Sequence, residues 1–275
     1  MSAWLFCPGH DAKKVGKALE SKVNAVVIDW EDAVPQTAKE RARQTTDAVL
    51  ARRREPTPQI LVRTNAAGTD EFARDLAAIQ SMPVDGLMLP KSESVDEIRR
   101  ACRLGVRVVA LIETALGVER AGQIAGADKN VERLAFGSLD FIADVGGRWD
   151  PSGTGFAYAR QQVVLCGRAR GREAPLDGVW PLLGDIEGLR RDCGTARDIG
   201  YGGKMVIHPE QILPVQESFA PTETEIEWAR RIVTASRIAL AAGETALRLD
   251  GQFVDPPIVR RAEEILRHAD EVSDE

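Results

Sequence analysis

The stretch AVVIDWEDAV, residues 25 to 34, runs from four apolar residues into three carboxylates within four positions. An apolar run of strand length that ends in charged residues is typical of a buried parallel strand whose carboxyl end meets a polar edge. Runs of this kind recur along the chain. They are AWLFCP (3–8), NAVVIDW (24–30), QILVRTN (59–65), GLMLPK (86–91), VRVVALIET (106–114), RLAFGSLD (133–140), the weaker PLDGVW (175–180) and GKMVIHP (203–209).

Charged segments of helix length separate these runs, such as AKKVGKALESK (12–22) and TDEFARDLAAIQ (69–80). Eight strands alternating with amphipathic helices predict an α/β fold, the (β/α)8 TIM barrel. A doubly wound open sheet has the same alternation. Two features favour the barrel: no G-x-G-x-x-G follows the first strand, and the polar residues gather at the carboxyl ends of the runs, which a barrel brings to one mouth.

The segment after the eighth strand is surplus to a barrel. PTETEIEWARRIVTASRIALAAG (221–243) predicts a long helix with Thr222 as its cap and Gly243 at its end. A short extended segment, a break at DPP (255–257) and a final helix follow. We therefore expect a catalytic barrel domain at 1–220 and a C-terminal helical extension at 221–275, which packs on the barrel or on a neighbouring subunit of a homo-oligomer.

Composition excludes several classes of partner. The net charge is −6, from 36 basic and 42 acidic side chains, which argues against nucleic acid or an anionic membrane as the main partner. No signal peptide and no apolar run of spanning length is visible, so we expect a cytoplasmic protein. The four cysteines lack C-x-x-C spacing, which suits reduced core thiols.

Polar residues follow nearly every predicted strand. In strand order they are Asp29, Glu31, Asp32, Arg63, Asn65, Lys91, Glu113, Asp140, Asp177 and His208. Glu113 and Asp140 end two successive strands and bring oxygen ligands alone, which suits Mg²⁺. As single residues, each could instead cap a helix.

Arg63 lies inside an apolar strand, where an arginine rarely goes without a partner. It could bind a substrate carboxylate, form an ion pair with Asp29 or Glu31, or do both. Asp29, Glu31 and Asp32 would form an acidic shell beside the cation, unless Glu31 or Asp32 serves as a helix cap. Lys91 is expected to form an ion pair, with a Schiff base as the less favoured alternative. His208 is expected to be structural rather than a general base.

Seven motifs resemble one known family. They are LFCPG (5–9), DWEDAV (29–34), VRTNAAGT (62–69), LMLPKSES (87–94), ALIETALGV (110–118), LAFGSLDF (134–141) and GKMVIHPEQI (203–212). Together they resemble the citrate lyase β subunit group of the HpcH/HpaI aldolase superfamily. The resemblance extends in order over residues 3 to 255 and implies the same barrel.

The resemblance implies a Mg²⁺-dependent carbon–carbon lyase, with Mn²⁺ as the alternative ion. It would cleave or form a 3-hydroxyacyl-CoA thioester such as malyl-CoA or citramalyl-CoA, with an acyl-CoA and an α-keto acid as the other reactants. Glu113 and Asp140 would be the metal ligands. The catalytic set is Arg63, Asp255, Asp32 and Glu31, and the substrate-binding set is Arg63, Gly137, Ser138 and Lys91, with backbone N–H groups near Gly137 and Ser138 binding oxygen.

Asp255 matches an aspartate that reaches into a neighbouring subunit's site in such relatives, which implies a trimer or hexamer. It is the candidate acid/base, and an N-cap before the two prolines is an equal alternative. The segment HDAKK (10–14) departs from the family pattern, because arginines are expected near it, and Lys13 and Lys14 could replace them. A thioesterase, a free keto-acid aldolase and a subunit of a multi-protein citrate lyase are the alternative functions.

Overall fold

The computed structural model describes residues 2–52 and 58–273 of the chain. Internal packing divides the chain into two compact units, Met1–Phe219 and Ala220–Glu275. The first unit contains all eight barrel strands, and the second is built from helices and one small hairpin.

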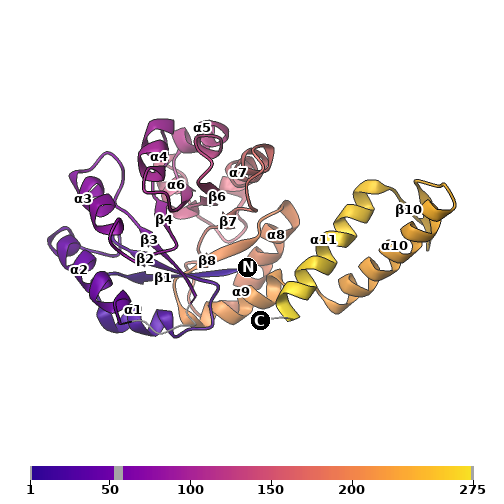
Figure 1. Ribbon diagram of the computed structural model, residues 1–275, viewed down its shortest axis with the longest axis horizontal. Helices are drawn as coiled ribbons and strands as arrows, with labels where there is room; N and C mark the ends of the chain where they lie inside the picture. Colours follow the sequence, from indigo (N-terminus) through magenta and orange to yellow (C-terminus); the bar gives the residue numbers. More distant parts are fainter. Residues whose placement is uncertain (1, 53–57, 274–275) are drawn as a thin grey trace. The chain divides into compact units, whose positions relative to one another are not determined.

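The first unit is a closed barrel of eight parallel strands in the order of the sequence, which confirms the predicted fold (Figure 1). The strands are β1 (Ala3–Pro8), β2 (Ala25–Asp29), β3 (Gln59–Arg63), β4 (Gly86–Leu89), β5 (Arg107–Ile112), β6 (Val131–Phe136), β7 (Leu176–Asp177) and β8 (Gly203–Val206). Pairing of β1 with β8 closes the ring, with Trp4 opposite Met205. All eight carboxyl ends therefore meet at one mouth.

Helices connect the strands and lie on the outside of the barrel (Figure 1). They are α1 (Ala12–Leu19), α2 (Lys39–Leu50), α3 (Asp70–Ile79), α4 (Val95–Cys102), α5 (Ala115–Ala125), α6 (Ser138–Asp144), α7 (Ala157–Ala169), α8 (Ile186–Ile199) and α9 (Ile212–Phe219). Short 3-10 helices precede α2, α7 and α9, namely η1 (Gln36–Ala38), η2 (Thr154–Phe156) and η3 (Pro209–Gln211).

Two apolar layers hold the barrel together because side chains alternate across each strand. One set fills the barrel interior and includes Trp4, Val27 and Leu111. The larger set lies between strands and helices and includes Ile28 and Phe72. This alternation decides which polar residues at the strand ends point into the mouth.

The strands are shorter than the sequence runs at their carboxyl ends. The run 133–140 predicts a strand through Asp140, but β6 stops at Phe136 and Ser138 begins α6. The weak run 175–180 contributes only two residues to β7. Polar residues that follow a strand leave the hydrogen-bonded ladder and build loops or helix starts instead.

The second unit contains α10 (Glu223–Ala241), the strands β9 (Leu247–Leu249) and β10 (Gln252–Val254), and α11 (Pro256–Ser273). Thr222 caps α10 as expected, in a capping box with Glu225. Ala229, Ile232 and Val254 lie in its own apolar core. That this unit packs on the barrel or on a neighbouring subunit stays a prediction.

The helices and the cysteines can be compared with what the composition predicted about membrane spans and thiols. Within residues 2–52 and 58–273, none of the helices combines the length and the apolar character needed to cross a bilayer. The four cysteines are free, and Cys7, Cys102 and Cys193 are buried. Burial raises the pKa of these three thiols to about 12, which keeps them protonated and unreactive at neutral pH.

Candidate active site

Strand alternation brings an ion pair into the barrel mouth. Asp29 ends β2 on the side of the interior residues Ala25 and Val27, and Arg63 ends β3 on the side of Leu61. The Arg63 Nε and Nη2 atoms each donate to one Asp29 carboxylate oxygen at 2.7 Å. This bidentate contact fixes the plane of the guanidinium.

The charges around this pair stabilise its ionised form. Burial alone would raise the pKa of Asp29, but the Arg63 guanidinium and the N–H groups of Glu31 and Ala33 hold it below its usual value. The pKa of Arg63 is raised despite burial, chiefly because Asp29, and then Glu31, place negative charge beside it. The guanidinium is therefore a permanent cation at the base of the mouth.

Glu31 connects Arg63 to Lys91. One Glu31 oxygen lies 3.1 Å from Arg63 Nη1 without hydrogen-bond geometry, and the other accepts from Lys91 Nζ at 2.5 Å. Burial raises the pKa of Glu31 in spite of these two cations. Lys39 of α2 donates to the backbone oxygens of Trp30 and Glu31, both at 2.7 Å, and so holds the loop that carries Glu31.

Lys91 adopts a left-handed backbone with φ of 46°, which is unfavourable for a residue with a side chain. In this conformation its backbone N–H donates to Glu113 Oε1 at 2.8 Å. Its side chain is 39% exposed. Burial alone would lower the pKa of Lys91, but the pair with Glu31 raises it. The amine is thus charged, which disfavours a Schiff base.

Glu113 follows β5 and is 1% exposed. Burial, then the negative charges of Glu31 and Asp140, raise its pKa to about 8. Asp140 is the third residue of α6 and is half-buried. Gly137 lies against Glu113, because a Cβ at this position would be 2.5 Å from Glu113 Oε2.

A divalent cation fits this arrangement. In the described part of the chain, no group of three or more His, Cys, Asp and Glu side chains is arranged to hold a metal. Mg²⁺ typically takes only one or two protein carboxylates and keeps water and substrate as its other ligands. The Glu113 carboxyl is held by one N–H, and nearby negative charge opposes its ionisation. A cation beside Glu113 and Asp140 would offset that repulsion.

The HpcH/HpaI aldolase/citrate lyase family matches residues 2–209. The chain belongs to this family. A citrate lyase subunit beta-like protein of Deinococcus radiodurans is 36% identical over 96% of this chain and 95% of its own length. A mitochondrial citramalyl-CoA lyase of Mus musculus is 30% identical over 99% of this chain and 87% of its own.

A solved structure agrees with the family assignment. The protein CitE of Mycobacterium tuberculosis, in complex with magnesium, acetoacetate and coenzyme A, superposes with a TM-score of 0.84. It is 33% identical, and the match covers 98% of both chains. The expected lyase class agrees with the family description. The expected Mg²⁺ agrees with the magnesium in this solved structure, and the expected CoA thioester agrees with its coenzyme A and with the name of the citramalyl-CoA lyase.

Several other residues singled out from the sequence lie outside the group formed by Asp29, Glu31, Arg63 and Lys91. The Asp32 side chain is 58% exposed, 3.8 Å from Arg63. Asn65 donates its backbone and side-chain N–H groups to Asp75 at 2.7 and 2.8 Å, and so ties the loop after β3 to α3. His208 accepts the Glu210 N–H through Nδ1 at the start of η3, the structural role expected.

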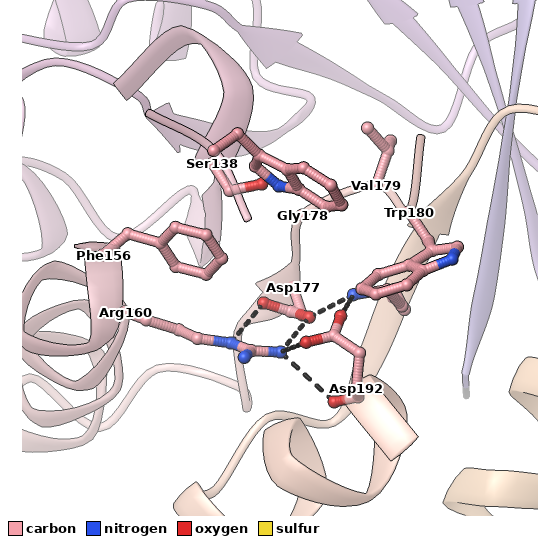
Figure 2. A pocket seen from close by; sticks show the side chains of 10 residues that line it. Ser138, Phe156, Arg160, Asp177, Gly178, Val179, Trp180 and Asp192 are labelled. Atoms are coloured by element: carbon pink, nitrogen blue, oxygen red, sulfur yellow. Dashed lines mark hydrogen bonds and ion pairs between the residues drawn. The ribbon is translucent and has the colours of Figure 1, made fainter. Parts of the chain in front are cut away.

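Asp177 does not point into the mouth. Leu176 takes the interior position of β7, so Asp177 faces the helices and contacts Arg160 of α7 and Lys204 of β8 (Figure 2). The Gly137 N–H, expected to bind substrate oxygen, instead donates to the Ile112 carbonyl at 3.0 Å.

Asp255 lies in the second unit, before α11. Its Oδ1 accepts the Ile258 N–H at 3.3 Å, which is an N-cap contact, while Oδ2 accepts no hydrogen bond in the described part of the chain. Lys13 and Lys14 are exposed in the first turn of α1.

Sequence reasoning missed one site residue, Lys39, and one role, that of Gly137. Lys39 lies on a helix, away from any strand end, and only its burial reveals it. The steric role of Gly137 was also missed. A glycine directly after a strand and facing a neighbouring strand end was the available signal.

Proposed function

We propose that this chain is a Mg²⁺-dependent carbon–carbon lyase that cleaves a 3-hydroxyacyl-CoA thioester, such as malyl-CoA or citramalyl-CoA, into an acyl-CoA and an α-keto acid. The reverse condensation uses the same groups. The observation that carries the proposal is the Glu113 carboxyl, 1% exposed and held by the Lys91 N–H, whose pKa is raised by burial and by the charges of Glu31 and Asp140. The Arg63 guanidinium, anchored by Asp29, is the positive charge of the same mouth.

In this proposal Glu113 and Asp140 hold Mg²⁺. When bound, the ion would supply positive charge that stabilises the negative charge developing on the substrate. Arg63 uses Nε and Nη2 to hold Asp29. Nη1 faces Glu31 at 3.1 Å without a hydrogen bond, and we assign it to the substrate oxygen on which charge develops. Because Asp29 fixes the guanidinium beforehand, no reorientation is needed during the reaction.

Lys91 and Glu31 flank the bound acid. The Lys91 ammonium is charged and part-exposed, which suits contact with a substrate carboxylate at the rim of the mouth. Glu31 shares its two oxygens between Lys91 and Arg63, so its negative charge offsets the repulsion between these two cations. Asp32 adds negative charge near Arg63, and we propose Ser138, buried at the start of α6, as a further substrate contact.

Proton transfer at the acyl carbon is assigned to Asp255 of a neighbouring subunit in a homo-oligomer. Its Oδ2 is unbonded within the described residues, which leaves this oxygen for a proton. In cleavage the substrate hydroxyl gives its proton to water and the carbon–carbon bond breaks with its electrons left on the enolate. The enolate carbon then receives a proton from Asp255, which regains one from water. The products are a keto acid and an acyl-CoA.

The test is a product assay. Purified protein is incubated with malyl-CoA or with citramalyl-CoA, each with Mg²⁺ or with a chelator, and the products are identified by mass spectrometry. We expect acetyl-CoA together with glyoxylate or pyruvate, and only when metal is present. Glu113→Gln keeps the side-chain volume and removes the charge, so it should abolish turnover.

Other product patterns would reject the proposal. Free CoA with intact malate or citramalate would indicate a thioesterase. Turnover of a free hydroxy acid without thioester would indicate a keto-acid aldolase. Activity that requires an added carrier protein would indicate a subunit of a multi-protein citrate lyase.

A further inference from the structure

A second buried ion cluster lies outside the mouth, between the barrel and its helices. Arg160 of α7 donates to the two Asp177 oxygens at 2.9 and 2.6 Å and lies 3.0 Å from Asp192 of α8. Lys204 of β8 binds both aspartates, with Asp192 at 2.5 Å. Figure 2 shows Arg160 joined to both carboxylates at the edge of a small hollow that Ser138 also lines.

The cluster is balanced in charge and closed to ligands. Arg160, Asp177 and Lys204 are each at most 3% exposed. Two cations contact two carboxylates, so no net charge remains for an anion or a metal. Buried ion pairs contribute little net stability compared with apolar packing, but they hold their partners in one geometry. The cluster is therefore best understood as a positioning device.

The barrel needs such a device at β7. This strand has two residues, with one aligned pair to β6 and two to β8. By comparison, β1 and β2 share five aligned pairs. With so few aligned pairs, the side-chain contacts of Asp177 with Arg160 and Lys204 add to the backbone pairing that holds β7 in place.

The position of β7 bears directly on the first turn of α6, which carries Asp140. Gly178 follows Asp177 and lies against the start of α6, because a Cβ there would be 2.7 Å from Ser138 Oγ and 3.0 Å from the Phe136 carbonyl oxygen. Ser138 begins α6, and Asp140 is two residues further on. A shift of β7 would therefore move the start of α6.

We propose that the cluster of Arg160, Asp177, Asp192 and Lys204 positions Asp140 for cation binding by fixing β7 against the start of α6. The inference rests on the proposed function, since it takes Asp140 as a metal ligand. It makes Asp177 a positioning residue that affects the metal site without contacting it.

The test is a calorimetric titration of the full chain with Mg²⁺ alone, comparing wild type with Asp177→Asn. The substitution keeps the size of the side chain and removes its charge. We expect Mg²⁺ to bind about tenfold more weakly, as for other residues that support a metal ligand. Excess Mg²⁺ should restore kcat, which a general loss of folding would not allow.

Two controls separate the outcomes. Leu189→Ala removes a buried side chain of α8 three residues before Asp192, and it should lower Tm without changing Mg²⁺ affinity. If Asp177→Asn does not fold, the same titration is made with Asp192→Asn, which leaves the Arg160–Asp177 contact intact. This variant should weaken Mg²⁺ binding by a smaller factor. Unchanged affinity in the folded variant would overturn the inference, whereas failure of the wild type to bind Mg²⁺ would overturn the metal site itself.

Discussion

Glu113 carries the most strongly raised pKa among the carboxyl groups at the mouth. Its ordinary value of 4.5 rises to about 8 in the metal-free chain, first because the group is buried and then because Glu31 and Asp140 are nearby. The native state therefore retains a proton that the unfolded state has lost. This stabilisation is complete below about pH 4.5 and is lost as the pH rises through 8.

The pH dependence of stability measures this effect. With chelator present, the free energy of unfolding in urea should fall more steeply between pH 6 and pH 9 in wild type than in Glu113→Gln, by about 2–3 kcal/mol. Saturating Mg²⁺ should remove the excess slope, because the ionised carboxylate then has a cation. Parallel curves for the two proteins would show that Glu113 is not perturbed.

A substitution at Gly137 tests whether the Glu113 carboxyl needs the space that the glycine leaves beside it. In Gly137→Ala the new methyl group would lie 2.5 Å from the Glu113 Cβ and Oε2, so the carboxyl must move. We expect at least a tenfold loss in Mg²⁺ affinity and in kcat/KM, measured by titration and by the lyase assay. The matched control is Gly122→Ala in α5, where the nearest atom is 3.6 Å away and activity should be unchanged.

Single residues were partly predictable from the sequence. An arginine inside an apolar strand required a partner, and Arg63 contacts both Asp29 and Glu31, which the sequence left open. The direction in which the Asp177 side chain points was not predictable. A strand of two residues has too little alternation to show which residue faces the barrel interior. The left-handed backbone of Lys91 could not be predicted either, because lysine is not a residue type that favours this conformation.

At the scale of elements, barrel closure depends on a close approach of backbones. Gly203 begins β8, and a Cβ there would lie 2.5 Å from the Ser2 carbonyl oxygen and 2.9 Å from the Ser2 Cα. Backbone atoms cannot move aside as a flexible side chain can. The contact between β1 and β8 is therefore sensitive to a single methyl group.

Gly203→Ala should lower the free energy of unfolding by about 1–3 kcal/mol, as overpacking usually does. Thermal unfolding followed by circular dichroism measures the change. Gly194→Ala provides the control, since it lies in α8 with no atom within 4 Å and should stabilise the chain slightly. Equal Tm values for wild type and Gly203→Ala would contradict the close approach.

The periodicity of apolar residues predicted which segments are helices and which are strands, but it did not predict the residues at which they begin and end. Val131 and Glu132 belong to β6 although the charged residues there obscure the apolar pattern. Val131 is aligned with Val108 of β5, and Glu132 forms ion pairs with Arg107 and Arg133. The β9–β10 hairpin was expected only as an extended segment. Its Asp250-Gly251 turn, with φ of 51° and 82°, is the stronger signal that the sequence did offer.

At the scale of the whole molecule, the proposed chemistry needs residues from both compact units. Glu113 and Asp140 belong to the first unit, and Asp255 belongs to the second. If Asp255 acts in a neighbouring subunit, two differently inactivated chains can complement each other within one oligomer.

Mixed oligomers test this arrangement. Asp255→Asn and Glu113→Gln should each be inactive alone, and Asp255→Asn should still bind Mg²⁺. Co-expression in equal amounts should recover about a quarter of wild-type activity, because a complete site then forms wherever the two variants meet in the right order. No recovery would assign Asp255 to its own chain, and an active Asp255→Asn would remove its role.

The neutral state of Glu113 has a consequence for how the protein matures. A carboxyl with a pKa of about 8 is uncharged at neutral pH, so the newly made chain can close its barrel without an unpaired charge at that position. Loading with metal then becomes a separate, late event that releases a proton to the medium. The heat of metal binding should therefore scale with the ionisation enthalpy of the buffer. Folded, metal-free protein can persist in the cell until it binds its ion.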